Sequence, residues 1–424
     1  MNRRLKHAIF FALCGAYLWN ATLIVISSLS STPRPRLQPQ LPMNGISQEE
    51  QSKYNDIVSS HADIPRYTEE MASQAIRSAP WTCGDPDDSA VDPITNQKPM
   101  FAFVHIYKTA GSSVRFFFQA YSHICRKAWM CLIGCTQVKP YSIVSTPGEG
   151  EGVRDWDKCR VKNVMDRHHV VESMGMDDRL YPTVNNTILR KSFDIYGGHF
   201  RIGTGDNILK NNSNIHAVRH IVFLRDPMER FVSGILYERK NDVNQSLTGT
   251  VDLIKKRIRG SRAADDYWDK SLTYLLTPKQ SEEFQKMKPA FMKAETTKKI
   301  SPREYFAEIK ARATIHNLHK YNVIVGMTER MNESMDVLKD VLLANRNEEH
   351  QTLLEQHANV TRNESNKGKI STASVMEALK IDKEFMSVFE EYVKFEKIIH
   401  DYAMSMHLMQ HGLFVKQTGS SSVD

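Results

Sequence analysis

The sequence has little cysteine, no internal repeat and only a small excess of charge. Its 424 residues include six cysteines and carry a formal net charge of +7. An excess of this size does not require a nucleic-acid partner, and we expect none. Hydrophobic residues make up 41% of the chain and charged residues 25%. Both fractions lie near the averages of globular proteins, which excludes a wholly disordered chain and a membrane protein with many spans.

The cysteines lack the CxxC spacing that is typical of structural zinc sites. Five of them lie beyond residue 29, and four of these fall within a short region: the set is Cys83, Cys125, Cys131, Cys135 and Cys159. In an oxidising compartment such a set predicts disulfides with one thiol left over, and the sequence leaves the pairing open. A zinc site is the alternative, but we expect no bound metal.

Long uncharged runs are also scarce, apart from one near the amino terminus. Three basic residues precede the stretch from Ala8 to Leu29, which has no charged residue. A helix that spans a bilayer needs about 20 apolar residues. We therefore predict a cytosolic tail at 1–7 and a transmembrane signal anchor at 8–29, with the rest of the chain in a lumen. A cleavable signal peptide is the alternative, although its apolar core is usually only about 7–15 residues long.

Two features beyond the predicted anchor indicate a luminal location and a stem. Residues 30–97 are rich in Pro, Ser, Gln and acidic residues, which is typical of a linker, and residues 37–97 carry a net charge of −7. Within it a short helix is expected near residues 64–75. The rest, from residue 98 onward, carries +9 and suits an anionic partner. Six glycosylation sequons follow the anchor, at Asn185, Asn211, Asn244, Asn332, Asn359 and Asn363.

From Met100 onward, apolar runs bounded by turns alternate with helical periodicity. Strands that alternate with helices predict an α/β fold with a central parallel sheet flanked by helices. We assign this domain to residues 98–410 and a carboxyl-terminal tail to 411–424. The strands are predicted at 101–106, 193–196, 220–224 and 322–325, and the helices after Ser112, after Pro227, at 334–344 and at 374–406.

The segment FAFVHIYKTAGSSVRFFFQAY predicts a strand, a tight turn and a helix. Free N–H groups at the start of the helix, together with its partial positive charge, make an anion site. Lys108 adds a full charge, and Thr109, Ser112 and Ser113 add hydroxyl donors. The loop is not a Walker A motif, because its lysine comes before the only glycine, Gly111. A plain strand–helix connection with a solvated lysine is the alternative.

The segment HIVFLRDPMERFVSGILYERKND predicts a second junction of strand, turn and helix. Asp226 is a good N-cap, and Pro227 suits the first helical position. Glu229 stands at the position that completes a capping box with Asp226. These residue types together predict a helix that begins at Pro227.

Basic and hydroxyl side chains gather at this second junction. Arg225 ends the strand, and Arg230, Ser233 and Tyr237 follow on one face of the predicted helix. An arginine fork with a serine hydroxyl suits a phosphate monoester. Alternatively, the two arginines pair with the acidic residues of the turn and only hold it in place.

The two junctions resemble the cofactor motifs of the membrane-anchored carbohydrate sulfotransferases of the Golgi, a family that includes heparan sulfate 2-O- and 6-O-sulfotransferases. HIYKTAGSS resembles the family loop that binds the 5′-phosphosulfate of 3′-phosphoadenosine 5′-phosphosulfate (PAPS), and RDPMERFVS resembles the element that binds its 3′-phosphate. KYNVIVGMTERMNESMDVL, NVTR and EKIIHDYA resemble later family segments in the same order, so the similarity covers residues 100–406. Tyr107 departs from the family, whose members usually carry proline there.

The resemblance implies a P-loop-like sulfotransferase domain that takes PAPS as sulfuryl donor without a metal. It also implies a single-pass type II protein of the Golgi membrane with a luminal catalytic domain. The cofactor-binding residues that it implies are Lys108, Thr109, Ala110, Gly111, Ser112, Ser113, Arg225, Ser233, Thr361 and Arg362. For Thr361 and Arg362, a glycosylated surface loop between two sequons is the alternative.

Between the two junctions, FDIYGGHFRIG predicts a strand that ends in two glycines before His199. The glycines leave open backbone where a substrate could approach. By itself a histidine there is more often packed or solvated, but the family carries a GH element at this place. The resemblance therefore implies that His199 is the general base. Some relatives have a second histidine where this chain has Gly197. We assign to Lys108 the stabilisation of negative charge on the departing oxygen.

The sequence says less about the molecule that accepts the sulfuryl group than about the donor. Two basic clusters, at 255–262 and 286–299, fit either a polyanionic glycan or solvated helix faces. We expect transfer to a carbohydrate hydroxyl, with a glycosaminoglycan-like chain as acceptor, and a tyrosine acceptor stays open. Two other hypotheses are a luminal phosphotransferase that uses ATP and an anchored glycan-binding protein without activity.

Overall fold

The computed structural model describes residues 63–79, 96, 98–140, 195–198, 201–203, 216–260, 273–293, 301–343, 352 and 370–419, except for positions 112, 115–116, 119–120, 122–124, 126–128, 134–136, 240–241 and 243–244. The predicted anchor at 8–29 lies outside these ranges. Among the described residues, no helix combines the length and apolar character needed to cross a membrane.

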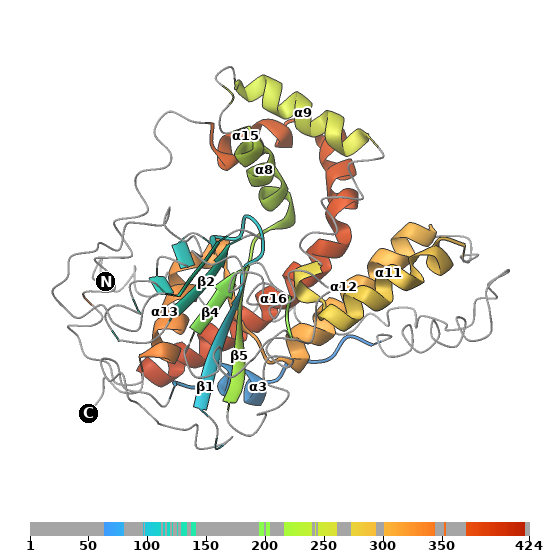
Figure 1. The fold of residues 1–424 in the computed structure, drawn as a ribbon. Helices are drawn as coiled ribbons and strands as arrows, with labels where there is room; N and C mark the ends of the chain where they lie inside the picture. The colour runs from blue at the N-terminus through green and yellow to red at the C-terminus, as the bar shows by residue number, and fades with distance from the viewer. Residues whose placement is uncertain are drawn as a thin grey trace, which may run out of the picture.

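The core of the fold is a six-stranded sheet in the order β3-β2-β4-β1-β5-β6 (Figure 1). Neighbouring strands run parallel, except that β3 runs antiparallel to β2 at one edge. Parallel strands flanked by helices confirm the predicted α/β class. The strands are β1 (Lys98–Val104), β2 (Trp129–Ile133), β3 (Gln137–Pro140), β4 (Ile195–Gly198), β5 (His216–Leu224) and β6 (Ile324–Met327).

The register brings the carboxyl ends of the central strands to one edge of the sheet. Val104 of β1 pairs with Gly198 of β4 and with Val222 of β5, and Leu224 pairs with Met327 of β6. The segments that follow β1, β4 and β5 therefore begin side by side. In open α/β sheets, ligands bind beyond this edge.

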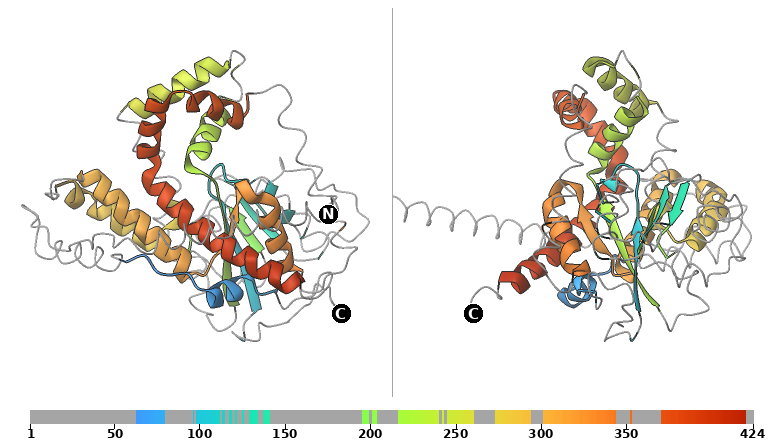
Figure 2. Two further views of the ribbon diagram at one scale, coloured as in Figure 1. Left: turned by 180° about the vertical axis from the view of Figure 1, so that it is seen from behind. Right: turned by 60° about the vertical axis from the view of Figure 1, so that its left-hand side comes forward.

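Helices pack on the sheet and beyond its carboxyl edge (Figures 1 and 2). Helix α16 runs diagonally across the sheet and continues into a lobe formed with α8, α9 and α15. The helices are α3 (Glu69–Ile76), α8 (Pro227–Glu238), α9 (Leu247–Arg259), α11 (Pro278–Lys293), α12 (Pro302–Lys320), α13 (Met331–Leu342), α15 (Thr372–Lys380) and α16 (Lys383–Gly419), with the 3₁₀ turn η3 at Thr328–Arg330.

Alternate residues of β1 face two separate hydrophobic clusters, as the two-residue period of a strand requires. Ala102 and Val104 pack with buried residues of α12 and α16. Phe101 and Phe103 pack with α13 and with the helical residues between 111 and 125. Both faces of the central strand are covered, which explains why its residues 100–104 are all apolar instead of alternating.

The predicted strands are present, with bounds that differ by a few residues. Strand β6 begins at Ile324, two residues later than predicted, because Asn322 has a left-handed backbone with φ of 41° and belongs to the preceding turn. Its side chain donates to the carbonyl of Met71 at 2.9 Å and accepts from the Tyr67 hydroxyl at 3.1 Å. The turn is therefore held by residues far away in sequence.

The prediction of one helix over 374–406 is wrong. The chain forms two helices, α15 and α16, with a break at Ile381 and Asp382. The Asp382 carboxylate accepts a hydrogen bond from the Phe385 N–H at 3.0 Å and one from Lys255 at 2.6 Å. A new cap therefore starts α16, which then continues into the residues predicted as a tail.

Residues 63–79, which the sequence assigns to the stem, pack onto the domain. Ala72, Ala75 and Ile76 of α3 are buried, and Arg219 of β5 donates to the carbonyl of Ala75 at 2.5 Å. Helix α3 also contacts α13 and α16. This part of the chain behaves as an element of the fold and carries part of its core.

Candidate active site

The segment after β1 makes a tight turn at the carboxyl edge of the sheet. The His105 N–H donates to the carbonyl of Gly198 at 2.8 Å, which ties the ends of β1 and β4 together. Lys108 and Ala110 have left-handed backbones, with φ of 66° and 56°. Such conformations turn backbone N–H groups into an anion-binding concavity. The helical residues begin at Gly111, and the Val114 N–H donates to the Ala110 carbonyl at 3.1 Å.

Gly111 occupies a position that admits no side chain. A Cβ there would lie 1.5 Å from Nε2 of His105, whose ring stacks on Phe103 at a centroid distance of 5.7 Å. The glycine lets the buried His105 ring pack beneath the start of the helix. The Thr109 hydroxyl points inward, since it is fully buried and donates to the Ile106 carbonyl at 2.9 Å. Only its backbone N–H could serve a ligand.

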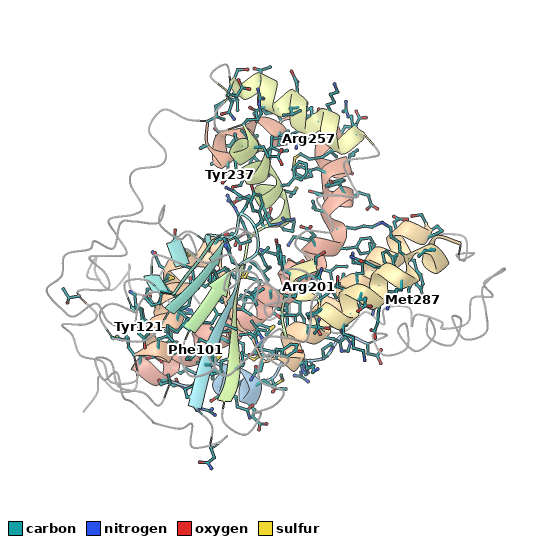
Figure 3. The ribbon with its side chains drawn as sticks, viewed as in Figure 1. Phe101, Tyr121, Arg201, Tyr237, Arg257 and Met287 are labelled. Atoms are coloured by element: carbon teal, nitrogen blue, oxygen red, sulfur yellow. The ribbon has the colours of Figure 1, made fainter. Side chains whose placement is uncertain are left out.

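Lys108 connects the first junction with the second. Its Nζ lies 4.1 Å from the ring centroid of Tyr237 on α8, which is a cation–π distance, and the rings of Tyr107 and Tyr237 meet edge to face at 5.8 Å. Figure 3 places Tyr237 on α8, above the sheet edge. Ser233 lies one turn before Tyr237 and is half-buried. The two predicted phosphate motifs therefore adjoin in space.

At the start of α8 the predicted N-cap is present, but the predicted capping box is not. Asp226 accepts hydrogen bonds from the N–H groups of Met228 and Glu229, at 3.0 and 3.1 Å. The prediction that Glu229 completes the box is wrong, because the Asp226 N–H donates to Glu329 of η3. Glu229 instead accepts from Arg225 at 3.0 and 3.3 Å. An acidic residue from the turn that directly follows β6 replaces the local one.

The two arginines of the second junction have different environments. Arg225 is partly exposed and pairs with Glu229 through Nε and Nη2, as the alternative interpretation of the turn expects. Arg230 is only 4% exposed and donates to both carboxylate oxygens of Glu396 on α16, at 2.6 and 2.8 Å. Arg230 therefore does not join Arg225 in an exposed fork, and its partner is not in the turn.

Several predicted site residues lie outside the described ranges: Ser112, His199, Thr361 and Arg362. The residues on either side of His199 are partly described. Gly198 accepts from His105, as noted above. Downstream, the Ile202 N–H donates to the Tyr274 carbonyl at 2.8 Å.

A buried histidine that the sequence did not single out holds this downstream segment. His220 of β5 accepts a hydrogen bond from the Gly203 N–H at 3.3 Å. Burial lowers the pKa of His220 to about 4, so the ring is neutral near pH 7 and can accept. Gly203 has φ of 76°, and a Cβ there would lie 2.3 Å from the Tyr321 hydroxyl. Only the tertiary structure brings these residues together.

A second histidine missed by the sequence lies on α16. His400 is 3.4 Å from Asp401 and 3.6 Å from Glu329, the residue that accepts from the start of α8. Burial opposes charge on the ring, but these two carboxylates raise the pKa of His400 to about 9. It is therefore protonated at neutral pH. No group of three or more metal-ligating side chains occurs in the part of the chain that the structure describes.

Comparison with known proteins gives no relative. No family model, no curated protein and no solved structure matches this chain.

Proposed function

We propose that this chain is a PAPS-dependent carbohydrate O-sulfotransferase anchored in the Golgi membrane, with its catalytic domain in the lumen. The observation that carries the proposal is the contact between Lys108 and Tyr237. It joins two strand–turn–helix junctions that leave the neighbouring parallel strands β1 and β5. One junction offers an anion-binding turn and the other an arginine and a serine. A donor with phosphates at both ends suits this pair of sites.

The residues of the first junction fit a phosphosulfate group. The left-handed backbones of Lys108 and Ala110 supply N–H groups, and Gly111 keeps the helix start free of a side chain. PAPS supplies the sulfuryl group. The Lys108 ammonium offsets the negative charge that develops on the oxygen between sulfur and phosphate. His199 takes the proton from the attacking sugar hydroxyl.

The second junction would hold the 3′-phosphate. Arg225 and Ser233 provide the charge and the hydroxyl, with Thr361 and Arg362 as further ligands. Glu229 competes for Arg225, and an incoming phosphate would share or replace that half-exposed ion pair. The basic character of residues 98–424 suits a polyanionic, glycosaminoglycan-like acceptor.

Sulfate transfer by the purified protein tests the proposal. Full-length protein in detergent is incubated with labelled PAPS and a panel of desulfated glycans, without divalent metal. We expect labelled product. His199→Ala should abolish transfer and leave binding of the desulfated nucleotide product unchanged. Lys108→Ala should lower kcat about 100-fold, as for loss of one group that stabilises a developing anion, whereas substitution of the exposed Lys380 on α15 by alanine should not.

Three outcomes would contradict the proposal. Strict magnesium dependence with ATP as donor would indicate a phosphotransferase. Glycan binding without any heat of binding for the nucleotide product would indicate a binding protein. Full turnover in His199→Ala would remove His199 as the base. Fluorescence imaging of the tagged chain tests the Golgi location.

A further inference from the structure

A small pocket lies where the end of β5, the first turns of α8 and the middle of α16 meet. Its polar lining consists of Arg225, Arg230, Glu396 and His400, and Leu275 is among its apolar lining residues. Its cavity volume is about 20 Å³, slightly more than one water molecule needs. It is large enough for one small polar group.

Two buried nitrogen donors in this lining have no hydrogen-bond partner among the described residues. The Arg230 side chain is 5% exposed, and its Nη2 makes both bonds to Glu396 while Nη1 is buried without a bond. The His400 side chain is 8% exposed, and its Nε2 is likewise buried without one. Its distance of 3.6 Å to Glu329 is too long for a hydrogen bond. Buried donors without partners are rare in native structures and call for an acceptor.

The charges around the pocket favour an anion as that acceptor. Arg225, Arg230 and the protonated His400 line it, and the one carboxylate that the described residues contribute to the lining, Glu396, is held by Arg230. Behind His400 lie Glu329 from η3 and Asp401 from α16, and Asp401 also binds Lys397. Glu229 contacts Arg225 from α8. These acidic groups contact the cations and are not part of the lining.

The pocket shares Arg225 with the proposed donor site, and the other donor-site residues lie outside it. Lys108, Ser233 and Tyr237 do not line it. Leu275 does, and the neighbouring Tyr274 accepts from Ile202, three residues after His199. The pocket is therefore linked to the segment that carries the proposed base.

We propose that this pocket binds one acid group of the acceptor, a carboxylate or a sulfate, through Arg230 and His400. The choice of acceptor as the source of the acid rests on the proposed function. Such a site would align an acidic sugar with the base, because an oxyanion bound at fixed donors positions the ring that carries it.

Inorganic sulfate is the first probe. Its affinity for the full-length protein is measured by calorimetry at constant ionic strength, for wild type, His400→Gln and the control His411→Gln. His411 lies on the same helix, 3.5 Å from Glu333 and outside the pocket. We expect His400→Gln to weaken sulfate binding about tenfold or more, the effect of losing one charged hydrogen bond. The control should bind as wild type does, and equal affinity in all three proteins would overturn the proposal.

A pH series on wild type gives a second readout that needs no substitution. His400 loses its proton as pH rises through about 9, whereas the arginines stay charged. Sulfate affinity should therefore fall between pH 7 and 10 and reach a lower plateau. An affinity that does not change over this range would contradict a role for His400.

Acceptor kinetics separate this proposal from the proposed function. In His400→Gln we expect a higher KM for an acidic glycan and unchanged affinity for the desulfated nucleotide product. A matching loss of nucleotide affinity would assign the pocket to a donor phosphate and overturn the acceptor assignment. If His400→Gln transfers sulfate at the wild-type rate and with the wild-type KM, the acceptor pocket is refuted and the proposed function is not. If the wild-type protein transfers no sulfate but binds inorganic sulfate in a way that depends on His400, the proposed function is refuted. The pocket would then stand as an oxyanion site only.

Discussion

Gly111 lies against the His105 ring, and a single added methyl group would collide with it. A Cβ at this position would be 1.5 Å from Nε2 and 2.1 Å from Cδ2 of His105. The ring is buried and stacked on Phe103, so it has little room to move away. The loop and the helix start would have to shift instead.

Gly111→Ala should therefore destabilise the protein by about 1–3 kcal/mol, the usual effect of overpacking, and should weaken binding of the desulfated nucleotide product. Urea unfolding and calorimetry measure the two effects. Gly412→Ala on α16 is the matched control, because a Cβ there meets nothing within 4 Å. It should be neutral or stabilising, since alanine favours helix more than glycine does. Equal stability of both variants would contradict this prediction and show that the His105 ring moves aside at little cost.

Arg230 shows that a sequence pattern does not determine the ion-pair partner of a charged residue. It shares a helix face with Ser233 and Tyr237, as the spacing predicts. Its partner, however, is Glu396, which is 166 residues away. Helical periodicity determines a face, and the fold decides which element covers it.

At the scale of elements, the buried pair of Arg230 and Glu396 joins α8 to α16. Removing one partner leaves the other charge buried without compensation, so Arg230→Met or Glu396→Leu alone should cost about 3–5 kcal/mol in unfolding free energy. The double variant should cost less than either single one. Urea unfolding of all four proteins measures the coupling. Lys286→Ala, which removes an exposed ion pair on α11, should change stability little. Additive effects of the two single variants would contradict this interpretation.

Two elements differ from the sequence expectation for the same reason. Asp382 starts a new helix within a continuous helical pattern, with Lys255 of α9 as a second partner. Glu329 takes the N–H that Glu229 was predicted to accept. At the start of α8 the distant residue replaces the local acceptor, whereas at Asp382 it adds a second contact to a local cap, and periodicity carries no information on such distant contacts.

At the scale of the whole molecule, two buried histidines set opposite limits on stability. Burial lowers the pKa of His220 to about 4, below the unfolded value of 6.5. The stability that depends on neutral His220 is therefore fully present above pH 6.5 and is lost as the pH falls towards 4. The carboxylates around His400 raise its pKa to about 9. The stability that depends on protonated His400 is fully present below pH 6.5 and is lost as the pH rises through 9.

Stability should therefore be greatest near pH 6.5 and fall on both sides. On the alkaline side the loss attributable to His400 is on the order of 3 kcal/mol at most. Urea unfolding at several pH values tests this, and His400→Gln should flatten the curve between pH 7 and 9 and leave the His220 limb between pH 6.5 and 4 in place. An alkaline limb that persists in the variant would assign the loss to other groups.

The sequence by itself determined the alternation of strands and helices, the start of α8 and the placement of Lys108 in a turn. These depend on neighbours along the chain: apolar runs, the Asp226 cap, Pro227 and small turn residues. Only the tertiary structure decided that α3 belongs to the core, that Arg230 is buried against Glu396, that His220 binds Gly203 and that His400 lines the pocket. The reason is physical: capping and periodicity act over a few residues, whereas burial and ion pairing depend on which distant elements the fold brings together.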